Sequence, residues 1–321
     1  MLSIVIPVLD EANSLAPLFD ELSAVITAQK YDAEIILVDD GSSDCSWRTI
    51  GELAEKDPRV RGIRFRRNFG KAAALNAGFN AARGETIVTL DADLQDDPRE
   101  IPKLLEKLNH DCDVVSGWKQ VRYDPWHKVL PSRVFNWLVG CMTGVWLHDH
   151  NCGMKAYRRE VFNEVRLYGE LHRFVPVLAN ARGFRVGEVA IQHRPRKYGQ
   201  SKYGIARFVK GFLDLLTVKF LTGYGQLPQH FLGAAGLLFT ALGFIGMAYL
   251  AIYWIFRTLW FPDWSPLHER PALLYSLGSL LFGGQLMSIG FLAELITAYY
   301  GRDADSYSIS ERINEPREPR R

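Results

Sequence analysis

Two kinds of hydrophobic pattern follow each other along the chain. Up to about residue 200, short apolar runs alternate with segments in which apolar residues recur at helical spacing. The alternation of strand-like and helical segments predicts an α/β domain with a mostly parallel sheet covered on both faces. The runs typical of buried strands are residues 4–8, 35–38, 62–65, 86–90 and 113–116. Helical stripes are seen at Leu15, Leu18, Phe19 and Leu22, and at Ala74, Leu75, Gly78 and Phe79.

The second pattern is a pair of long apolar segments near the C-terminus. Residues 231–256 carry no charge, which as a helix is long enough to cross a bilayer core of about 30 Å. Residues 272–300 are nearly as apolar, so the two segments predict a transmembrane hairpin that returns the chain to its starting side. Basic residues interleaved with apolar ones precede the hairpin and predict a helix in the membrane interface. These basic residues are Lys202, Arg207, Lys210 and Lys219.

The chain is therefore expected to have four segments. They are a globular domain (1–202), an interfacial helix with its linker (203–229), two transmembrane helices (230–300) and a partly disordered tail (301–321). The basic excess before the hairpin, and an N-terminus without the features of a signal peptide, place the globular domain and the tail in the cytoplasm. We therefore expect a multi-pass protein of the inner, cytoplasmic membrane.

Charge and cysteine content exclude some functions. A net charge of +2 is too small to suggest nucleic-acid binding, and no basic face interleaved with aromatic residues recurs. The four cysteines are widely spaced without a Cys-x-x-Cys pair, so neither a zinc site nor a disulfide framework is indicated.

The strongest chemical signal lies where the apolar run 86–90 ends in Asp91-Ala92-Asp93-Leu94-Gln95. An Asp-x-Asp pair can hold a hard cation such as Mg²⁺ or Mn²⁺, which keeps positions open for diphosphate oxygens. The alternative is an ordinary acidic loop or a helix cap.

Polar residues also follow the first two strand-like runs. Asp39 and Asp40 can accept hydrogen bonds from a base and a ribose, and Pro7 and Glu11 follow the first run. The alternative is a glycine turn and a helix cap at residues 41–44, and both interpretations can hold together. Carboxyl ends of parallel strands share one edge of a sheet, so we expect these residues and the Asp-x-Asp pair on one rim.

Six motifs together resemble the family 2 glycosyltransferases. Ile4-Val5-Ile6-Pro7 with Glu11, Val38 to Asp44, and Asp91 to Gln95 are similar to the nucleotide-sugar motifs of that family, which implies a GT-A, Rossmann-like fold. Three further motifs resemble the polyprenyl-phosphate glycosyltransferases, the group of dolichyl-phosphate mannose synthase and its bacterial undecaprenyl-phosphate relatives. They are Arg67 to Lys71, Asp149 to Lys155, and Arg196 to Tyr203.

The resemblance implies roles for residues at matching positions. Pro7, Glu11, Asp39 and Asp40 would hold the nucleoside, Asp91 would orient the donor, and Asp93 and Gln95 would ligate the metal. Arg196, Ser201 and Lys202 would lie on a loop that closes over the diphosphate and the acceptor phosphate. Arg122 and Arg133 match further catalytic positions, across a region where the family varies; attraction to the membrane surface is the alternative for such basic residues. Asp149 is a site residue whose role as base, sugar ligand or loop anchor stays open.

We therefore expect inverting transfer of a sugar from a nucleotide-sugar donor to polyprenyl phosphate at the cytoplasmic membrane face. The resemblance favours a UDP-sugar such as UDP-glucose, undecaprenyl phosphate, and Mg²⁺ or Mn²⁺; a homo-oligomer is compatible with it. One alternative is a processive polysaccharide synthase, although the sequence has no Gln-x-x-Arg-Trp motif and two spans only. The other is an inactive membrane scaffold, although clustered acids without a role would repel one another.

Overall fold

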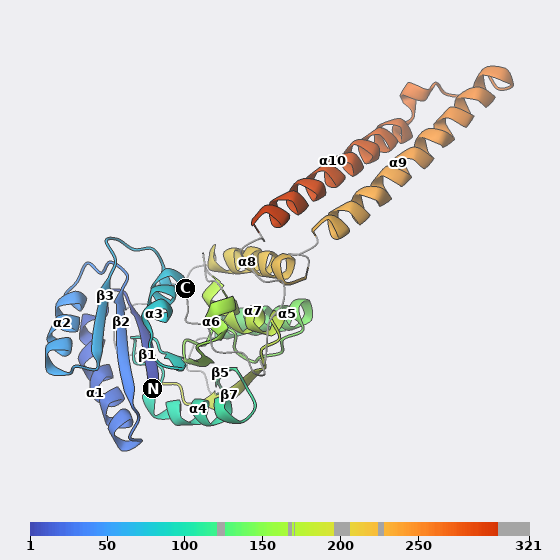
Figure 1. Ribbon diagram of the computed structural model, residues 1–321. Coiled ribbons are helices and arrows are strands. Elements are labelled where there is room, and N and C mark those ends of the chain that lie inside the picture. The colour runs from blue at the N-terminus through green and yellow to red at the C-terminus, as the bar shows by residue number, and fades with distance from the viewer. Residues whose placement is uncertain (121–125, 166–168, 170, 196–205, 224–227, 301–321) are drawn as a thin grey trace. The chain divides into compact units, whose positions relative to one another are not determined.

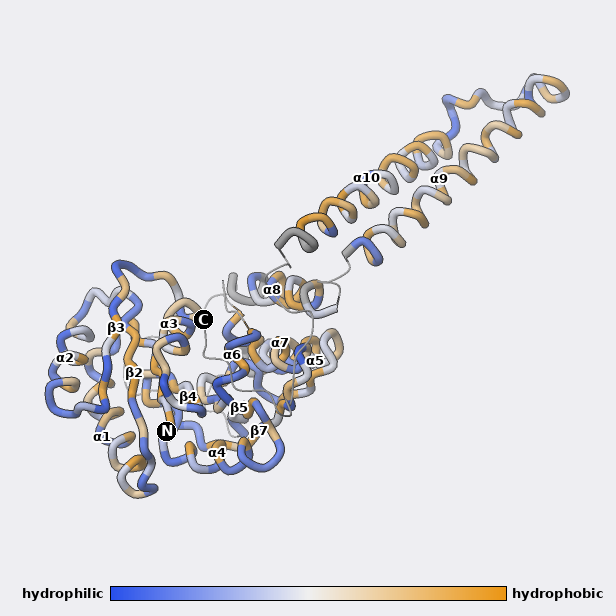
Figure 2. Tube along the Cα trace, viewed as in Figure 1, coloured by the Kyte–Doolittle hydropathy of each residue, from blue (hydrophilic) through white to orange (hydrophobic). Residues whose placement is uncertain are grey.

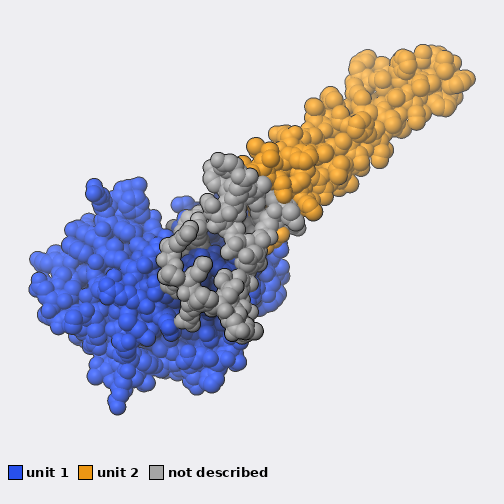
Figure 3. Space-filling view, viewed as in Figure 1, with its two compact units in different colours: residues 1–219 blue, residues 220–321 orange. Residues whose placement is uncertain are grey.

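The computed structural model describes residues 1–120, 126–165, 169, 171–195, 206–223 and 228–300 (Figure 1). Its contacts divide the chain into two compact units, residues 1–219 and 220–321 (Figure 3). The first unit contains the sheet, and the second contains the two long helices.

A seven-stranded mixed sheet organises the first unit, in the order β3-β2-β1-β4-β6-β5-β7. Strands β3, β2, β1 and β4 are parallel, β6 runs antiparallel to both β4 and β5, and β7 is parallel to β5. The five predicted strands are confirmed as β1 to β5, whereas β6 and β7 had no recognised pattern. The strands are β1 Leu2–Val8, β2 Ala33–Asp39, β3 Val60–Arg64, β4 Thr86–Thr89, β5 Val114–Lys119, β6 Lys155–Arg158 and β7 Val186–Ile191.

Helices cover both faces of the sheet because alternate strand residues point to opposite faces. Ile4 and Ile6 of β1 pack in one core with α1, α2 and α4, while Val5 packs in the other with α3, α6 and α7. The helices of this unit are α1 Ala12–Ala28, α2 Ser46–Lys56, α3 Lys71–Ala81, α4 Ile101–His110, α5 Trp126–Thr143, α6 Val161–Glu164, α7 Val175–Ala181 and α8 Ala206–Gly223, with 3₁₀ turns η1 Pro98–Glu100 and η2 Leu171–Phe174.

Helix α8, predicted as the interfacial helix, has two apolar faces. Leu215 and Val218 are fully buried in a third core with Phe135 of α5 and Phe174 of η2. On the other face, Phe212, Leu213 and Leu216 are exposed. The helix therefore completes the core of the first unit and still presents apolar surface.

The second unit is a helical hairpin of α9 (Pro228–Leu259) and α10 (Pro271–Tyr300), joined through η3 (Leu267–Glu269). Figure 2 shows hydrophobic residues along both helices. Within residues 229–259 and 271–296, 18-residue stretches reach mean hydropathies of 2.0 and 1.5, and both helices are long and apolar enough to cross a membrane. The helices approach closely, since a Cβ atom at Gly283 would lie 2.7 Å from the Gly236 carbonyl oxygen. At one end of the hairpin, Glu294 accepts a hydrogen bond from the Gln229 backbone N–H.

Candidate active site

The loops that follow β1 and β2 are hydrogen-bonded to each other. The two strands end level, with Val8 opposite Asp39. The backbone N–H of Asp10 donates to Ser42 Oγ at 3.0 Å, and that of Glu11 donates to Ser46 Oγ at 2.9 Å. Half-buried Glu11 is therefore held beside the second loop, as the shared rim of parallel strand ends predicts.

Asp39 and Asp40 shape this rim through their own carboxylates. Fully buried Asp39 accepts from the Ser42 N–H at 2.9 Å and lies 3.2 Å from Arg64 Nε. Asp40 accepts from the backbone N–H groups of Phe69 and Gly70, at 2.7 and 3.0 Å, and so holds the loop after β3. The predicted turn is therefore present, and contact with a nucleoside stays a prediction for both residues.

A glycine permits this packing of the second and third loops. Gly41 has a φ of +73°, in the left-handed region that other residues seldom adopt. A Cβ atom there would lie 2.5 Å from the backbone carbonyl carbon of Arg67. The Asp39-Asp40-Gly41 sequence thus brings the loops after β2 and β3 into contact.

The Asp-x-Asp segment follows β4, at the same edge of the sheet. Lys71, the first residue of α3, donates to Asp91 Oδ1 at 2.5 Å, and Asp93 Oδ1 accepts from the Gln95 N–H at 3.2 Å. Buried Leu94 has a φ of 59°, a conformation that costs a non-glycine residue about 1–3 kcal/mol. Local strain therefore lies between the two predicted metal ligands.

The donor atoms suit the predicted cation. A carboxylate at Asp93 and an amide oxygen at Gln95 are hard oxygen ligands of the kind that Mg²⁺ and Mn²⁺ accept. Within the described ranges, no three His, Cys, Asp or Glu side chains form a group able to hold a metal. A cation at Asp93 and Gln95 would keep coordination positions open for substrate oxygens and water.

Asp96, directly after Gln95, lies in a buried cluster of charged groups. Its Oδ1 atom is 2.9 Å from Lys119 Nζ at the end of β5 and 3.8 Å from His193 Nδ1 after β7. Burial alone would raise the pKa of the Asp96 carboxyl, but the Lys119 ammonium and His193 hold that pKa well below its ordinary value. The ends of β5 and β7 are thereby joined to the segment that contains Gln95.

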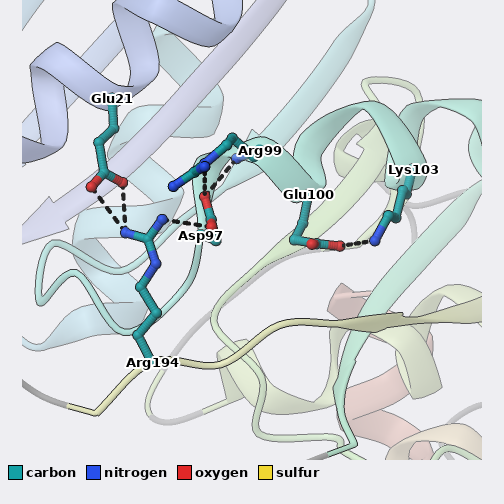
Figure 4. Close-up of polar contacts among 6 residues, drawn as sticks. All are labelled: Glu21, Asp97, Arg99, Glu100, Lys103 and Arg194. Carbon is teal, nitrogen blue, oxygen red and sulfur yellow. Dashed lines mark hydrogen bonds and ion pairs between the residues drawn. The ribbon is translucent and has the colours of Figure 1, made fainter.

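Arg194, which follows β7, joins helix α1 to the segment that contains Gln95 and Asp97 (Figure 4). Its guanidinium contacts Glu21 of α1 at 2.8 Å and Asp97 at 2.5 Å, and its backbone N–H donates to the Gln95 carbonyl oxygen at 2.8 Å. The next residues along the chain include Arg196, Ser201 and Lys202, which lie outside the described residues, as does Arg122.

The turn formed by residues 149–153, which begins at Asp149, packs against Asp91. Asp149 is 3% exposed, and its Oδ1 atom accepts from the Asn151 N–H at 3.1 Å. A Cβ atom at Gly153 would lie 2.4 Å from Asp91 Oδ2, so only glycine leaves room for that carboxylate. The structure therefore brings Asp149 and the Asp-x-Asp segment into one site.

A cavity of about 490 Å³ lies next to this turn. Exposed Arg133 and half-buried Lys119 supply positive charge, and Trp118 stacks on His148 with a ring separation of 4.1 Å. An aromatic wall with two cations suits a ligand that combines an anionic group with apolar or sugar surface. The lining residues are Trp118, Lys119, Gln120, Arg133, Asn136, Trp137, Trp146, Leu147 and His148.

Several residues of the site were not singled out from the sequence. Lys71 and Lys155 each end a motif that carried the resemblance, so a signal for them was present. Lys119 and Arg194 form ion pairs with residues distant in sequence, and no local pattern indicates such pairs.

A mostly parallel sheet with acidic residues at its carboxyl edge has the architecture of a GT-A glycosyltransferase. Residues 3–166 match the family model described as glycosyl transferase family 2, and the chain belongs to that family. Known proteins resemble it over nearly its whole length.

Two relatives illustrate this similarity. The chain is 38% identical over 94% of its length to dodecaprenyl-phosphate galacturonate synthase of Rhizobium johnstonii, covering 89% of that protein. It is 35% identical over 98% of its length to undecaprenyl-phosphate 4-deoxy-4-formamido-L-arabinose transferase of Edwardsiella ictaluri, covering 96% of that protein.

Solved structures support the fold. Glucosyl-3-phosphoglycerate synthase from Mycobacterium tuberculosis, in complex with Mn²⁺, UDP and phosphoglyceric acid, superimposes with a TM-score of 0.55. The match covers 69% of this chain and 78% of that chain at 16% identity, so it shows a common fold.

Proposed function

We propose that the protein transfers a sugar, with inversion, from a nucleotide-sugar donor to a polyprenyl phosphate at the cytoplasmic face of the membrane. The observation that carries this proposal is the acidic rim of a glycosyltransferase sheet in a chain that also contains two helices of membrane-spanning length. Both relatives are named for a polyprenyl phosphate, and this supports the same class of acceptor.

The donor is assigned to the loops after β1, β2 and β4. Pro7, Glu11, Asp39 and Asp40 would hold the nucleoside, and Asp91 would orient the sugar diphosphate. Asp93 and Gln95 would hold Mg²⁺ or Mn²⁺, whose positive charge would offset the negative charge of the departing nucleoside diphosphate. We propose a UDP-sugar as donor, with UDP-glucose as the first candidate from the family resemblance. The relatives are named for galacturonate and for 4-deoxy-4-formamido-L-arabinose, so their sugars are the next candidates.

The acceptor is assigned to the cavity beside Asp149. A phosphate oxygen of the lipid forms a bond to the anomeric carbon while the bond from that carbon to the diphosphate oxygen breaks, and the leaving diphosphate keeps the electron pair. A phosphate monoester is already ionised at neutral pH, so the site must mainly place it and offset its charge. Arg133 and Lys119 line the cavity and can do so, together with Arg122, Arg196, Ser201 and Lys202 by resemblance.

The membrane supplies the acceptor in this proposal. Helices α9 and α10 would span the inner membrane with both ends in the cytoplasm, and the exposed apolar face of α8 would lie in the interface. Undecaprenyl phosphate is the proposed lipid, because the relatives are named for undecaprenyl and dodecaprenyl chains.

The test is a panel of nucleotide sugars, offered with undecaprenyl phosphate and Mn²⁺ to the full-length protein in detergent or nanodiscs. We expect one donor to give a lipid product whose extracted mass equals polyprenyl phosphate plus one sugar. Products with many sugars per acceptor would favour a processive synthase instead. Absence of any product across the panel would contradict the proposed function.

A further inference from the structure

The turn that carries Asp149 is held from the side of the sheet by side-chain donors. Ser116 Oγ of β5 donates to the Asp149 carbonyl oxygen at 3.3 Å, and Thr89 Oγ1 of β4 donates to that of Gly153 at 2.8 Å. Both ends of the turn are thus fixed by neighbouring strands. Buried carbonyl groups need such partners because water does not reach them.

Lys155 holds the middle of the same turn. This first residue of β6 is only 3% exposed, and its Nζ atom donates to the carbonyl oxygens of His150 at 3.1 Å and Cys152 at 2.7 Å. An apolar side chain would fill the same space without the penalty of burying an ammonium group, but it would leave both carbonyls unsatisfied. Lys155 does not line the cavity, so it acts on a ligand only through other residues.

The charges around Lys155 are those of the proposed active site. Burial and the nearby Lys71 ammonium lower the pKa of Lys155 to about 8, although the Asp149 and Asp91 carboxylates oppose the decrease. Burial and the charge of Lys155 lower the pKa of His150 to about 4, and burial raises that of the Cys152 thiol, so both neighbours are neutral at pH 7. Besides its two hydrogen bonds to carbonyl oxygens, the Lys155 ammonium is thus influenced by the charges of Lys71, Asp149 and Asp91.

Resting on the proposed sugar transfer, we propose that Lys155 is a positioning residue that fixes the turn carrying Asp149 against Asp91 and keeps a positive charge beside both carboxylates. The contact of Gly153 with the Asp91 carboxylate transmits any shift of the turn to the donor side. The hydrogen bonds that build the nucleoside rim, such as Asp10 N–H to Ser42 and Phe69 N–H to Asp40, are separate from those that hold this turn. Loss of Lys155 is therefore expected to slow transfer far more than it weakens nucleotide binding.

Three variants of the full-length protein separate these effects. Lys155→Met removes both hydrogen bonds and the charge, and Lys155→Arg keeps a cation. Thr89→Val removes only neutral hydrogen bonds, one to the same turn and one with Tyr157. We expect Lys155→Met to lower kcat by about 50-fold or more while UDP affinity with Mn²⁺, measured by calorimetry, changes by less than about threefold. The kcat of Lys155→Arg should be at least about tenfold higher than that of Lys155→Met, and the kcat of Thr89→Val should be less than about fivefold below the wild-type value.

The pH dependence gives a second readout. The wild-type Lys155 is charged below about pH 8 and loses its proton as the pH rises through that value. We therefore expect wild-type kcat to fall between pH 7 and 9 relative to Lys155→Arg, whose guanidinium stays protonated. A structural role without a need for charge would leave the two profiles parallel and would overturn the proposal.

Hydrogen exchange tests the positioning role without the reaction. Amides of residues 149–153 should exchange faster in Lys155→Met than in the wild type or Lys155→Arg, and unchanged exchange would contradict the proposal. Full kcat in Lys155→Met, or equal losses of kcat and UDP affinity, would also contradict it. Failure of the proposed function would look different, because the wild type itself would then make no lipid-linked sugar. If Lys155→Met does not fold, the comparison of the kcat–pH profiles of Lys155→Arg and the wild type still tests the proposal.

Discussion

At the scale of single residues, the Asp-x-Asp segment combines ligand chemistry with local strain. Leu94 is held in a left-handed conformation although its side chain is buried. A fixed backbone at this position sets the directions in which the side chains of Asp93 and Gln95 project. Strain that the surrounding packing maintains is typical of functional sites, because it pre-organises ligands before the substrate binds.

Asp93→Asn tests the metal assignment. An amide is a poorer ligand than a carboxylate for a hard cation, so we expect turnover to fall by about 100-fold or more. The melting temperature should change little, because an asparagine oxygen can still accept from the Gln95 N–H. Asp111→Asn is the control, since that acid is 74% exposed beside Lys107. Turnover near the wild-type value with unchanged Mn²⁺ dependence would disprove the role of Asp93.

Gly153→Ala tests the contact between the Asp149 turn and Asp91. The new methyl group would lie 2.4 Å from Asp91 Oδ2, so the carboxylate or the turn must move. We expect the free energy of unfolding to fall by about 1–3 kcal/mol, which is typical of overpacking. Turnover should fall by more than the fraction of unfolded protein accounts for, because the reacting groups are displaced.

Gly51→Ala is the matched control for that substitution. Nothing lies within 4 Å of a Cβ atom at Gly51 in α2, so the change should stabilise the helix by up to about 1 kcal/mol and leave turnover unchanged. Equal turnover in the Gly153 and Gly51 variants would show that the contact with Asp91 is unimportant.

At the scale of secondary-structure elements, continuous apolar runs made five strands predictable. Strand β6 was not recognised because it has only four residues and begins and ends with a basic residue, Lys155 and Arg158, so only two central residues could signal a buried strand. The strand-end acids were predictable because parallel strands end at one edge. The ion pairs that connect these loops were not predictable, because partners such as Arg194 and Glu21 are 173 residues apart in the chain.

The Arg194 ion pairs provide a test at this scale. Arg194→Ala removes the contacts with Glu21 and Asp97 and leaves Asp97, which is 5% exposed, with fewer partners. Because Asp97 and the Gln95 carbonyl belong to the proposed metal-binding segment, we expect the Mn²⁺ concentration for half-maximal activity to rise by about tenfold. Glu21→Gln weakens only the ion pair between Arg194 and α1, so it should change this Mn²⁺ concentration by less than about threefold.

Titration with Mn²⁺ at saturating donor measures both variants of this test. If Glu21→Gln had the larger effect, the ion pair would serve to place α1 rather than the metal-binding segment.

At the scale of the whole molecule, the first compact unit ends within α8, at Lys219, rather than before that helix. The end of the globular domain at residue 202 stays a prediction, and the first compact unit extends to Lys219. The basic and apolar composition of this segment indicated an interfacial helix. It did not show that Leu215 and Val218 would be fully buried in the core with Phe135 and Phe174, because such long-range packing leaves no local pattern.

Truncation tests where the independently folding part ends. A chain that ends after Gly223 keeps Leu215 and Val218, and we expect it to unfold in one cooperative thermal transition and to bind UDP with Mn²⁺. A chain that ends at Lys202 loses both side chains and exposes Phe135 and Phe174. Loss of each large buried side chain costs about 2–5 kcal/mol, so this shorter chain should melt at a much lower temperature or aggregate.

Activity separates folding from access to the acceptor. If α9 and α10 serve to bring the protein to its lipid, the chain that ends after Gly223 should transfer sugar to a short, water-soluble prenyl phosphate at nearly the full-length rate. Its rate on undecaprenyl phosphate in vesicles should fall steeply, because the acceptor is then confined to a surface that the protein reaches only through α8. Equal loss on both acceptors would mean that the hairpin supports the active site itself. A stable, cooperatively folded chain ending at Lys202 would show that the packing of α8 is dispensable.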